Sequence, residues 1–143
     1  MKEFYSSYKP VIITVVIIIV IGLAIFFWGK KRGKEKAQGP QASYPKGAIN
    51  IPKDWNAEPL AIELHDVMSG LFTLTGTKDA AWNKLNQLGT DDMVVAVYNA
   101  FNQKYYDEKK ETLTDWIKKE DYYDYFSGVK DKTLALLARL NCQ

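Results

Sequence analysis

A stretch of 18 residues without a charged side chain, from Val11 to Trp28, limits the folding of this chain more than any other feature. As an α-helix the stretch would be about 27 Å long, which is close to the hydrocarbon thickness of a bilayer. A signal peptide would have a shorter apolar region followed by small residues, whereas this stretch ends in bulky aromatic residues. A buried core helix would show a polar face. We therefore predict an uncleaved transmembrane anchor within residues 1–29, and the anchor residues that we single out are Val11, Ile18, Phe26, Phe27 and Trp28.

Basic residues after this stretch predict its orientation. Residues 1–36 carry seven Lys/Arg against two Asp/Glu, a net charge of +5, and most of the positive residues follow the stretch. Because Lys and Arg favour the cytoplasmic side of a membrane, we predict a cytoplasmic C-terminal domain. The same side chains would lie against anionic lipid headgroups. They are Lys30, Lys31, Arg32, Lys34 and Lys36.

The rest of the chain has the opposite charge. Residues 37–143 carry 12 Lys/Arg against 15 Asp/Glu, a net charge of −3, and this lack of a basic patch argues against binding of nucleic acid. Cys142 is the only cysteine, so an intramolecular disulfide is excluded. It is the penultimate residue of a tail that we expect to be frayed, which argues against a catalytic role.

Residues 30–56 have the composition of a linker. Four of the five prolines lie between Pro40 and Pro59, and apolar periodicity is weak there. Such a segment buries too little apolar area to fold alone, which favours a solvated tether. The alternative is a segment that docks on the domain through Tyr44, Ile49, Ile51 and Trp55.

Residues 57–143 show helical periodicity and lack the Asn-Gly or Asp-Gly signals of β-hairpins, so we predict an all-α domain of five short helices. Thr112 and Asp115 have the spacing of a capping box at the start of the fourth helix. The expected helices lie near residues 57–71, 77–88, 93–105, 112–120 and 131–140. The side chains expected inside are Leu60, Leu64, Val67, Met68, Leu71, Trp82, Leu85, Met93, Val97, Ala100, Phe101, Tyr105, Leu113 or Ile117, Trp116, Thr133, Leu136, Leu137 and Leu140.

A Gly-Thr dipeptide followed by acidic residues occurs twice between these helices. Glycine can adopt a positive φ just past a helix and so end it. The threonine hydroxyl can then accept a hydrogen bond from an N–H of the next helix, whose positive end also favours nearby carboxylates. We therefore predict that four residues act as helix caps: Gly76, Thr77, Gly89 and Thr90.

Three segments of the domain resemble a single annexin repeat. They are an amphipathic helix with Leu64, Met68 and Gly70 followed by TGTKD (Thr75–Asp79), YNAFNQKYYDEKKETLTDWIKKED (Tyr98–Asp121) and FSGVKDKTLALLARL (Phe126–Leu140). The resemblance covers about residues 57–141, and single modules of this kind are also similar to parts of small bacterial and phage proteins. It implies a small five-helix, annexin-like bundle.

The resemblance also implies a calcium site, which this sequence reproduces only in part. Calcium sites of the family use a Gly-x-Gly-Thr loop and a carboxylate from roughly 40 residues later. Here Leu74 replaces the first glycine, Asp115 is the nearest acid for the phrase at Gly76, and Asp131 is the nearest for the phrase at Gly89. Calcium takes six to eight oxygen ligands, which neither phrase clearly supplies. We expect no metal and no cofactor, and a calcium- or phospholipid-binding module that uses Gly76 and Asp115 is the alternative.

Groups that could perform catalysis are sparse. His65 is the only histidine, and its neighbours Glu63 and Asp66 suggest a general base. Its place on the polar flank of the first helix favours a solvated histidine instead. A glycan hydrolase would need paired carboxylates and a substrate cleft, for which so small a domain has little room. We therefore expect a protein that is not an enzyme.

Tyrosines gather before the last helix, in the run Tyr122-Tyr123-Asp124-Tyr125. One helix junction can hardly bury so much aromatic area, and tyrosine is enriched at protein interfaces. Core packing with the hydroxyl groups at the surface is the alternative. We predict that a protein partner binds Tyr122, Tyr123, Tyr125 and Phe126. The sequence thus predicts a single-pass, membrane-anchored scaffold whose partners are the lipid bilayer and an unidentified protein, such as a capsid or envelope protein, in a bacterial envelope or in the virion membrane of a phage.

Overall fold

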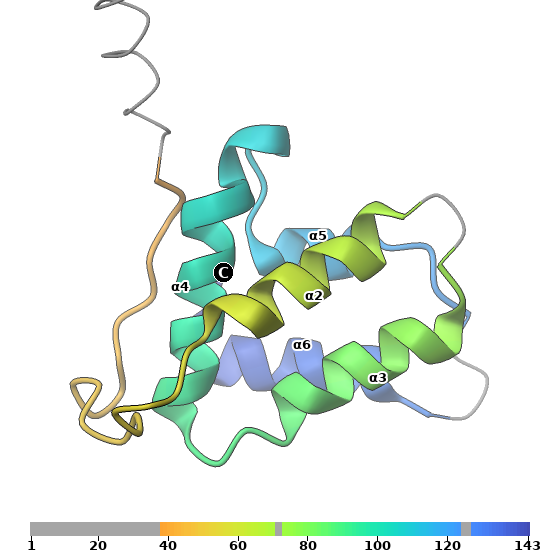
Figure 1. Cartoon of the computed structure of the whole chain (residues 1–143). Helices are drawn as coiled ribbons and strands as arrows, with labels where there is room; N and C mark the ends of the chain where they lie inside the picture. Colours follow the sequence, from red (N-terminus) through yellow and green to blue (C-terminus); the bar gives the residue numbers. More distant parts are fainter. Residues whose placement is uncertain (1–37, 71–72, 124–126) are drawn as a thin grey trace, which may run out of the picture. The chain divides into compact units, whose positions relative to one another are not determined.

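A computed structural model describes residues 38–70, 73–123 and 127–143, and these residues form an all-α fold without strands (Figure 1). These described residues belong to one compact unit. The predicted anchor and its basic flank lie outside the described residues, and no helix within these residues is long and apolar enough to cross a membrane. The five helices of the described part are α2 (Glu58–Ser69), α3 (Thr75–Asn86), α4 (Asp91–Lys109), α5 (Leu113–Lys119) and α6 (Val129–Arg139).

The hydrophobic core lies where these helices meet. α2 packs against α3 and α4, α3 packs against α6, and α5 packs against α4 and α6. Figure 1 shows α4 standing upright at one side, with the other helices extending away from it. The side chains that helical periodicity placed inside include Trp82, Leu85 and Phe101, and all three are fully buried. Burial of a large apolar side chain typically stabilises a fold by about 1.5–3 kcal/mol, so this shared core holds the short helices together.

The start of α4 confirms one of the predicted caps. Thr90 is the N-cap, and its hydroxyl accepts a hydrogen bond from the backbone N–H of Met93 at 3.2 Å. The predicted capping box of α5 is also present, because Thr112 and Asp115 bond to each other's backbone N–H groups. These two helices start where the local sequence supplies a side-chain acceptor.

The start of α3 corrects the other cap prediction. The helix begins at Thr75 after the extended Leu74, so Gly76 and Thr77 lie within its first turn and do not cap it. The carbonyl of Leu74 accepts the N–H of Thr77 at 3.0 Å, which leaves no role for the threonine hydroxyl as an N-cap. Neither Gly76 nor Gly89 adopts the expected positive φ. Backbone hydrogen bonds from Gln87 and Leu88 finish α3, so a left-handed glycine is not needed there.

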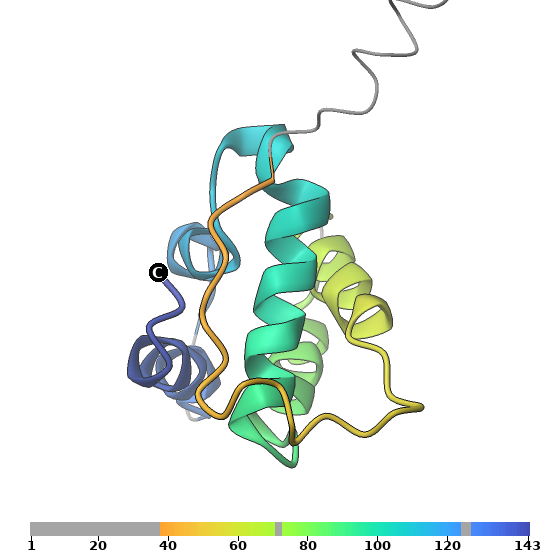
Figure 2. The ribbon, with the colours of Figure 1, turned by 90° about the vertical axis from the view of Figure 1, so that its left-hand side faces the viewer.

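Residues 38–50, which we call the strap, run along α4 in the opposite direction (Figure 2). Near the C-terminal end of α4, Asn102 donates its side-chain amide to the carbonyl of Pro40 at 2.7 Å. One turn earlier, the side chain of Asn99 bonds both the N–H (2.8 Å) and the carbonyl (3.0 Å) of Ala42. The compact unit therefore includes a segment that its composition suggested as a solvated linker.

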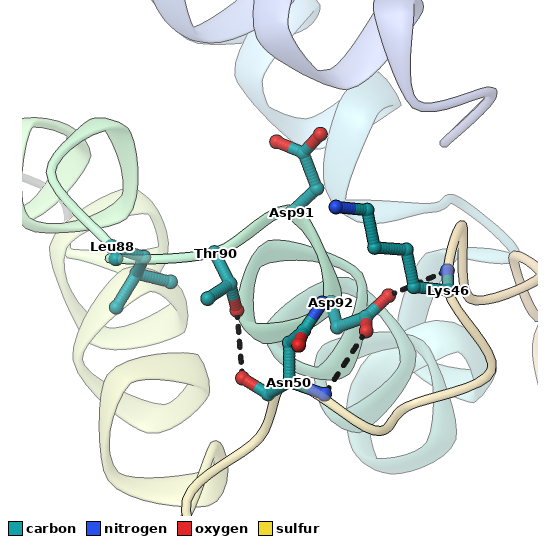
Figure 3. A pocket seen from close by; sticks show the side chains of 7 residues that line it. Lys46, Asn50, Leu88, Thr90, Asp91 and Asp92 are labelled. Carbon is teal, nitrogen blue, oxygen red and sulfur yellow. Dashed lines mark hydrogen bonds between the residues drawn. The ribbon is translucent and has the colours of Figure 1, made fainter.

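The strap ends against the first turn of α4 (Figure 3). The carboxylate of Asp92, which is 1% exposed, accepts the backbone N–H groups of Lys46 (3.1 Å) and Asn50 (3.4 Å). Thr90 donates its hydroxyl to the carbonyl of Asn50 at 3.0 Å. Asp92, Asn99 and Asn102 are seven and three residues apart, which places all three on one face of α4.

The C-terminal tail is fixed on the bundle, and our expectation of a frayed end is wrong. Tyr98 donates its hydroxyl to the carbonyl of Gln143 at 2.6 Å, and Thr114 donates to the carbonyl of Cys142. The Cys142 side chain is fully buried, and this burial raises the pKa of its thiol to about 12. Buried hydroxyl groups need acceptors, and the carbonyls of the tail supply them.

Candidate interaction surface

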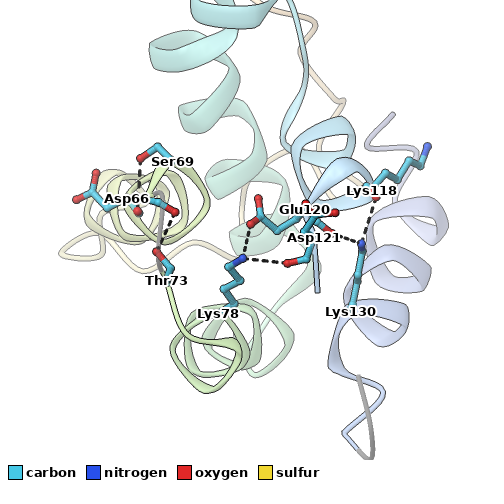
Figure 4. A network of polar contacts seen from close by, with 9 residues as sticks. Asp66, Ser69, Thr73, Lys78, Lys118, Glu120, Asp121 and Lys130 are labelled. Atoms are coloured by element: carbon cyan, nitrogen blue, oxygen red, sulfur yellow. Dashed lines mark hydrogen bonds and ion pairs between the residues drawn. The ribbon is translucent and has the colours of Figure 1, made fainter. Parts of the chain in front are cut away.

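The first turn of α3 is bonded to the segment that follows α5, and we call this connection the joint (Figure 4). Lys78 is 6% exposed, and its ammonium group bonds the carboxylate of Glu120 and the carbonyl of Asp121 (3.1 Å). Lys130 of α6 donates to the carbonyl of Glu120 at 2.8 Å. A buried ammonium group needs such partners, because an uncompensated buried charge is strongly destabilising. The joint thus fixes the segment after α5 relative to α3 and α6.

Tyr122 belongs to the joint. Its hydroxyl bonds the carboxylate of Asp79 and, at 2.8 Å, the hydroxyl of Ser127. Its ring meets Trp82 edge-on, with the ring centroids 4.9 Å apart. Among the tyrosines predicted to bind a partner, this one is therefore partly buried and used in packing, as the alternative reading of the sequence had it.

Tyr123 differs from its neighbour, because 75% of it is exposed. Leu74, just before α3 on the other side of the joint, is 76% exposed. Two large exposed side chains thus border the hydrogen-bonded joint. The predicted partner-binding residues Tyr125 and Phe126 lie outside the described residues.

The sequence reasoning missed Leu74. A signal was present, because Phe72 and Leu74 are large apolar residues between the first two expected helices, where polar and small residues are usual. Leu71, which was expected inside, lies outside the described residues together with Phe72. In the described part of the chain, the other large hydrophobic residue that is mostly exposed is Ile49, on the strap. Figure 1 shows the strap beside α4, while the start of α3 and the segment after α5 lie away from α4. Ile49 is therefore separate from the joint.

A cavity of about 300 Å³ lies between the strap and the start of α4 (Figure 3). Its two carboxylates already have partners within the protein, because Asp92 binds the strap and Asp91 forms an ion pair with Arg139 (2.7 Å). The hydrogen bond from Arg139 lowers the pKa of the Asp91 carboxyl. The cavity is lined by Gly89, Thr90 and both aspartates. Thr90 and Asp92 bind the strap, and Asp91 binds Arg139 of α6.

The calcium candidates have structural roles. Gly76 lies within the first turn of α3, and Asp115 accepts two hydrogen bonds from Thr112 in the capping box of α5. Within the described residues, no group of three or more His, Cys, Asp or Glu side chains is arranged to hold a metal ion.

His65 corrects another expectation, because its side chain is only 15% exposed and is not a solvated histidine. Its ring stacks on Tyr105 at a centroid distance of 3.8 Å, nearly parallel. Its Nε2 lies 3.0 Å from the carboxylate of Glu108, and its Nδ1 lies 3.3 Å from that of Asp66. His65 therefore joins α2 to the C-terminal part of α4.

Comparison of the chain with protein-family models, with curated proteins and with solved structures gave no match. The annexin resemblance therefore stays a prediction. The candidate interaction surface stands on the exposed residues at the joint alone.

Proposed function

We propose that this chain is a single-pass, membrane-anchored tether, without enzymatic activity, whose helical unit binds a protein partner at the joint. The anchor part of the proposal rests on the uncharged stretch and its basic flank. The binding part rests on one observation: Leu74 and Tyr123 are each at least 75% exposed beside a buried ion pair that fixes their surroundings.

Rigid surroundings favour binding because they reduce the entropy that association costs. Tyr123 follows directly after Tyr122, whose hydroxyl is bonded and whose ring is packed. Leu74 directly precedes α3, whose first turn contains Lys78. A partner would therefore meet two apolar side chains close in sequence to residues that the joint holds in place. Aromatic residues in such positions are frequent binding hot spots.

The place of the strap supports the same proposal. The strap enters the unit near the C-terminal end of α4, where the N–H of Gly39 donates to the carbonyl of Asn102. The joint is at the side of the bundle away from α4 (Figure 1). A tether attached through the strap would leave the joint open to a partner.

Site-specific photo-crosslinking in the chain's native cells tests the binding site. The full chain carries p-benzoylphenylalanine in place of Tyr123, or in place of Ile49 as a matched control that is 80% exposed on the strap. We expect a discrete crosslinked protein from position 123 and none from position 49. Equal crosslinking from both positions, or only crosslinks to lipid, would contradict the proposed protein contact.

Alkaline extraction of membranes tests the anchor independently. The full-length chain should stay in the pellet, because the uncharged stretch is long enough to span a bilayer. A mature protein that starts after Trp28, or a full-length chain in the supernatant, would contradict the proposed anchor.

A further inference from the structure

We propose that the strap is a releasable part of the tether: under load it detaches from α4 as a unit and lengthens the connection to the anchor while the helical bundle stays folded. The release itself is a property of residues 38–143. Its role in tether length rests on the proposed function.

The strap is held mainly by hydrogen bonds to its backbone N–H and carbonyl groups. Asn102 bonds the carbonyl of Pro40, Asn99 bonds both backbone groups of Ala42, and the Asp92 carboxylate accepts two N–H groups of the turn that follows. The strap adds few apolar contacts, since Ala42 and Tyr44 are partly buried against the core and Ile49 is 80% exposed. The attachment is therefore mainly polar, whereas the helices are held by a buried apolar core.

This difference allows the strap to leave while the bundle stays folded. When the strap leaves, water can reach Asp92, Asn99 and Asn102 and replace the lost partners, so these groups do not stay buried without hydrogen bonds. Asn102 also keeps its other hydrogen bond, in which its side-chain oxygen accepts the backbone N–H of Leu113 at 2.9 Å. Units held by few apolar contacts are the ones that open first in native proteins.

Release would change the reach of the tether. Between Trp28, the end of the predicted anchor, and the strap lie nine residues, which extend to at most about 30 Å. Trp55, partly buried against the core, is the next attachment point. With residues 38–54 released, the connection would comprise 26 residues and extend to about 90 Å, roughly three times as far.

The backbone of the strap lies very close to the side chain of Tyr106 on α4 at Gly39. A Cβ atom added at Gly39 would lie 2.6 Å from the Cβ atom of Tyr106, closer than such atoms approach in proteins. Gly39 thus permits backbone contact at the end of the strap that a tether would pull. A substitution there should weaken the attachment without changing any residue of the helices.

Single-molecule force spectroscopy on the full chain in detergent tests the proposal. Handles are attached to the N-terminus and to a cysteine at the exposed Ala135 of α6 (Ala135→Cys); the buried Cys142, with its raised thiol pKa, should not compete for the handle. We expect a reversible first extension of at most about 60 Å, the length of 17 residues, before the bundle unfolds. Asn99→Ala and Gly39→Val should each shorten the bound lifetime at a given force by about tenfold or more and leave the second event unchanged.

Lys84→Ala, which removes an exposed ion pair on α3, is the matched control and should change neither event. Hydrogen exchange on the unsubstituted chain gives a second measurement: the amides of Ala42, Lys46 and Asn50 should exchange together and before those of α4. A single unfolding event without the early step, or exchange of these amides only with global unfolding, would overturn the proposal. Neither measurement needs a partner or a membrane, so failure of the proposed function would show separately.

Discussion

Two short regions of this molecule share the phrase Gly-Thr followed by an acidic residue and yet have different structures. At Gly89-Thr90 the threonine is the N-cap of α4, whereas at Gly76-Thr77 the helix has already begun. The residues after each threonine also make different tertiary bonds. Lys78 donates hydrogen bonds to the segment after α5, whereas Asp92 accepts hydrogen bonds from the strap. The same local phrase therefore caps a helix at one place and lies within the first turn of a helix at the other.

The largest effect expected at these two regions follows from Lys78→Ala. The substitution leaves the Glu120 carboxylate, 15% exposed, without its ammonium partner, and loss of one partner of a buried pair typically costs about 3–5 kcal/mol. Lys84→Ala is the control, because its pair with Glu63 is exposed and should be worth less than about 1 kcal/mol. Chemical denaturation of the full chain in detergent measures both. Equal losses would show that the joint does not hold α3 in place.

The neighbours Asp91 and Asp92 give the next comparison. Asp92→Ala removes the acceptor of two strap N–H groups, so we expect a loss of about 2 kcal/mol. Asp91→Ala removes only an ion pair with Arg139, whose side chains are 44% and 56% exposed, and should cost less than about 1 kcal/mol. Thermal melts at pH 7 of the two variants check this order. If Asp91→Ala cost more stability than Asp92→Ala, the surface ion pair with Arg139 would stabilise the fold more than the strap does.

The smallest effects separate the two threonines directly. Thr90→Ala removes the N-cap of α4 and should destabilise the fold by about 1 kcal/mol, with Thr90→Ser retaining most of the stability. Thr77→Ala changes a residue in the first turn of α3 that makes no capping bond, so its effect should stay within about 0.5 kcal/mol. Urea midpoints give both values. Similar losses of stability for Thr90→Ala and Thr77→Ala would contradict the different roles given to the two threonines.

The sequence was sufficient to place many core side chains and insufficient for the strap. Trp82, Leu85 and Phe101 could be placed inside because helical periodicity depends only on neighbours along the chain. Asn99 and Asn102 give no comparable signal, because their partners are backbone atoms about 60 residues away and any strap sequence offers the same atoms.

The candidate surface could also be predicted only in part. Surplus aromatic residues before α6 pointed to Tyr123, but Tyr122 next to it proved to be part of the joint. Tyr122 is packed because its hydroxyl bonds Asp79 and Ser127. Which tyrosine can make these bonds depends on the position of α3 relative to the segment after α5. Cys142 and His65 were misplaced for a related reason: each is buried by residues distant in sequence.

The most direct test of the central claim, that the joint presents a protein-binding surface, is the dissociation constant of the crosslinked partner for the double variant Leu74→Ser with Tyr123→Ser. Interface hot spots cost about 2 kcal/mol or more each, so for two additive hot spots we predict a constant raised about 700-fold or more. Ile49→Ser should leave it unchanged, and exposed substitutions should keep the unfolding free energy within about 0.5 kcal/mol. A double variant that stays folded and binds its partner as tightly as the unsubstituted chain would contradict the account.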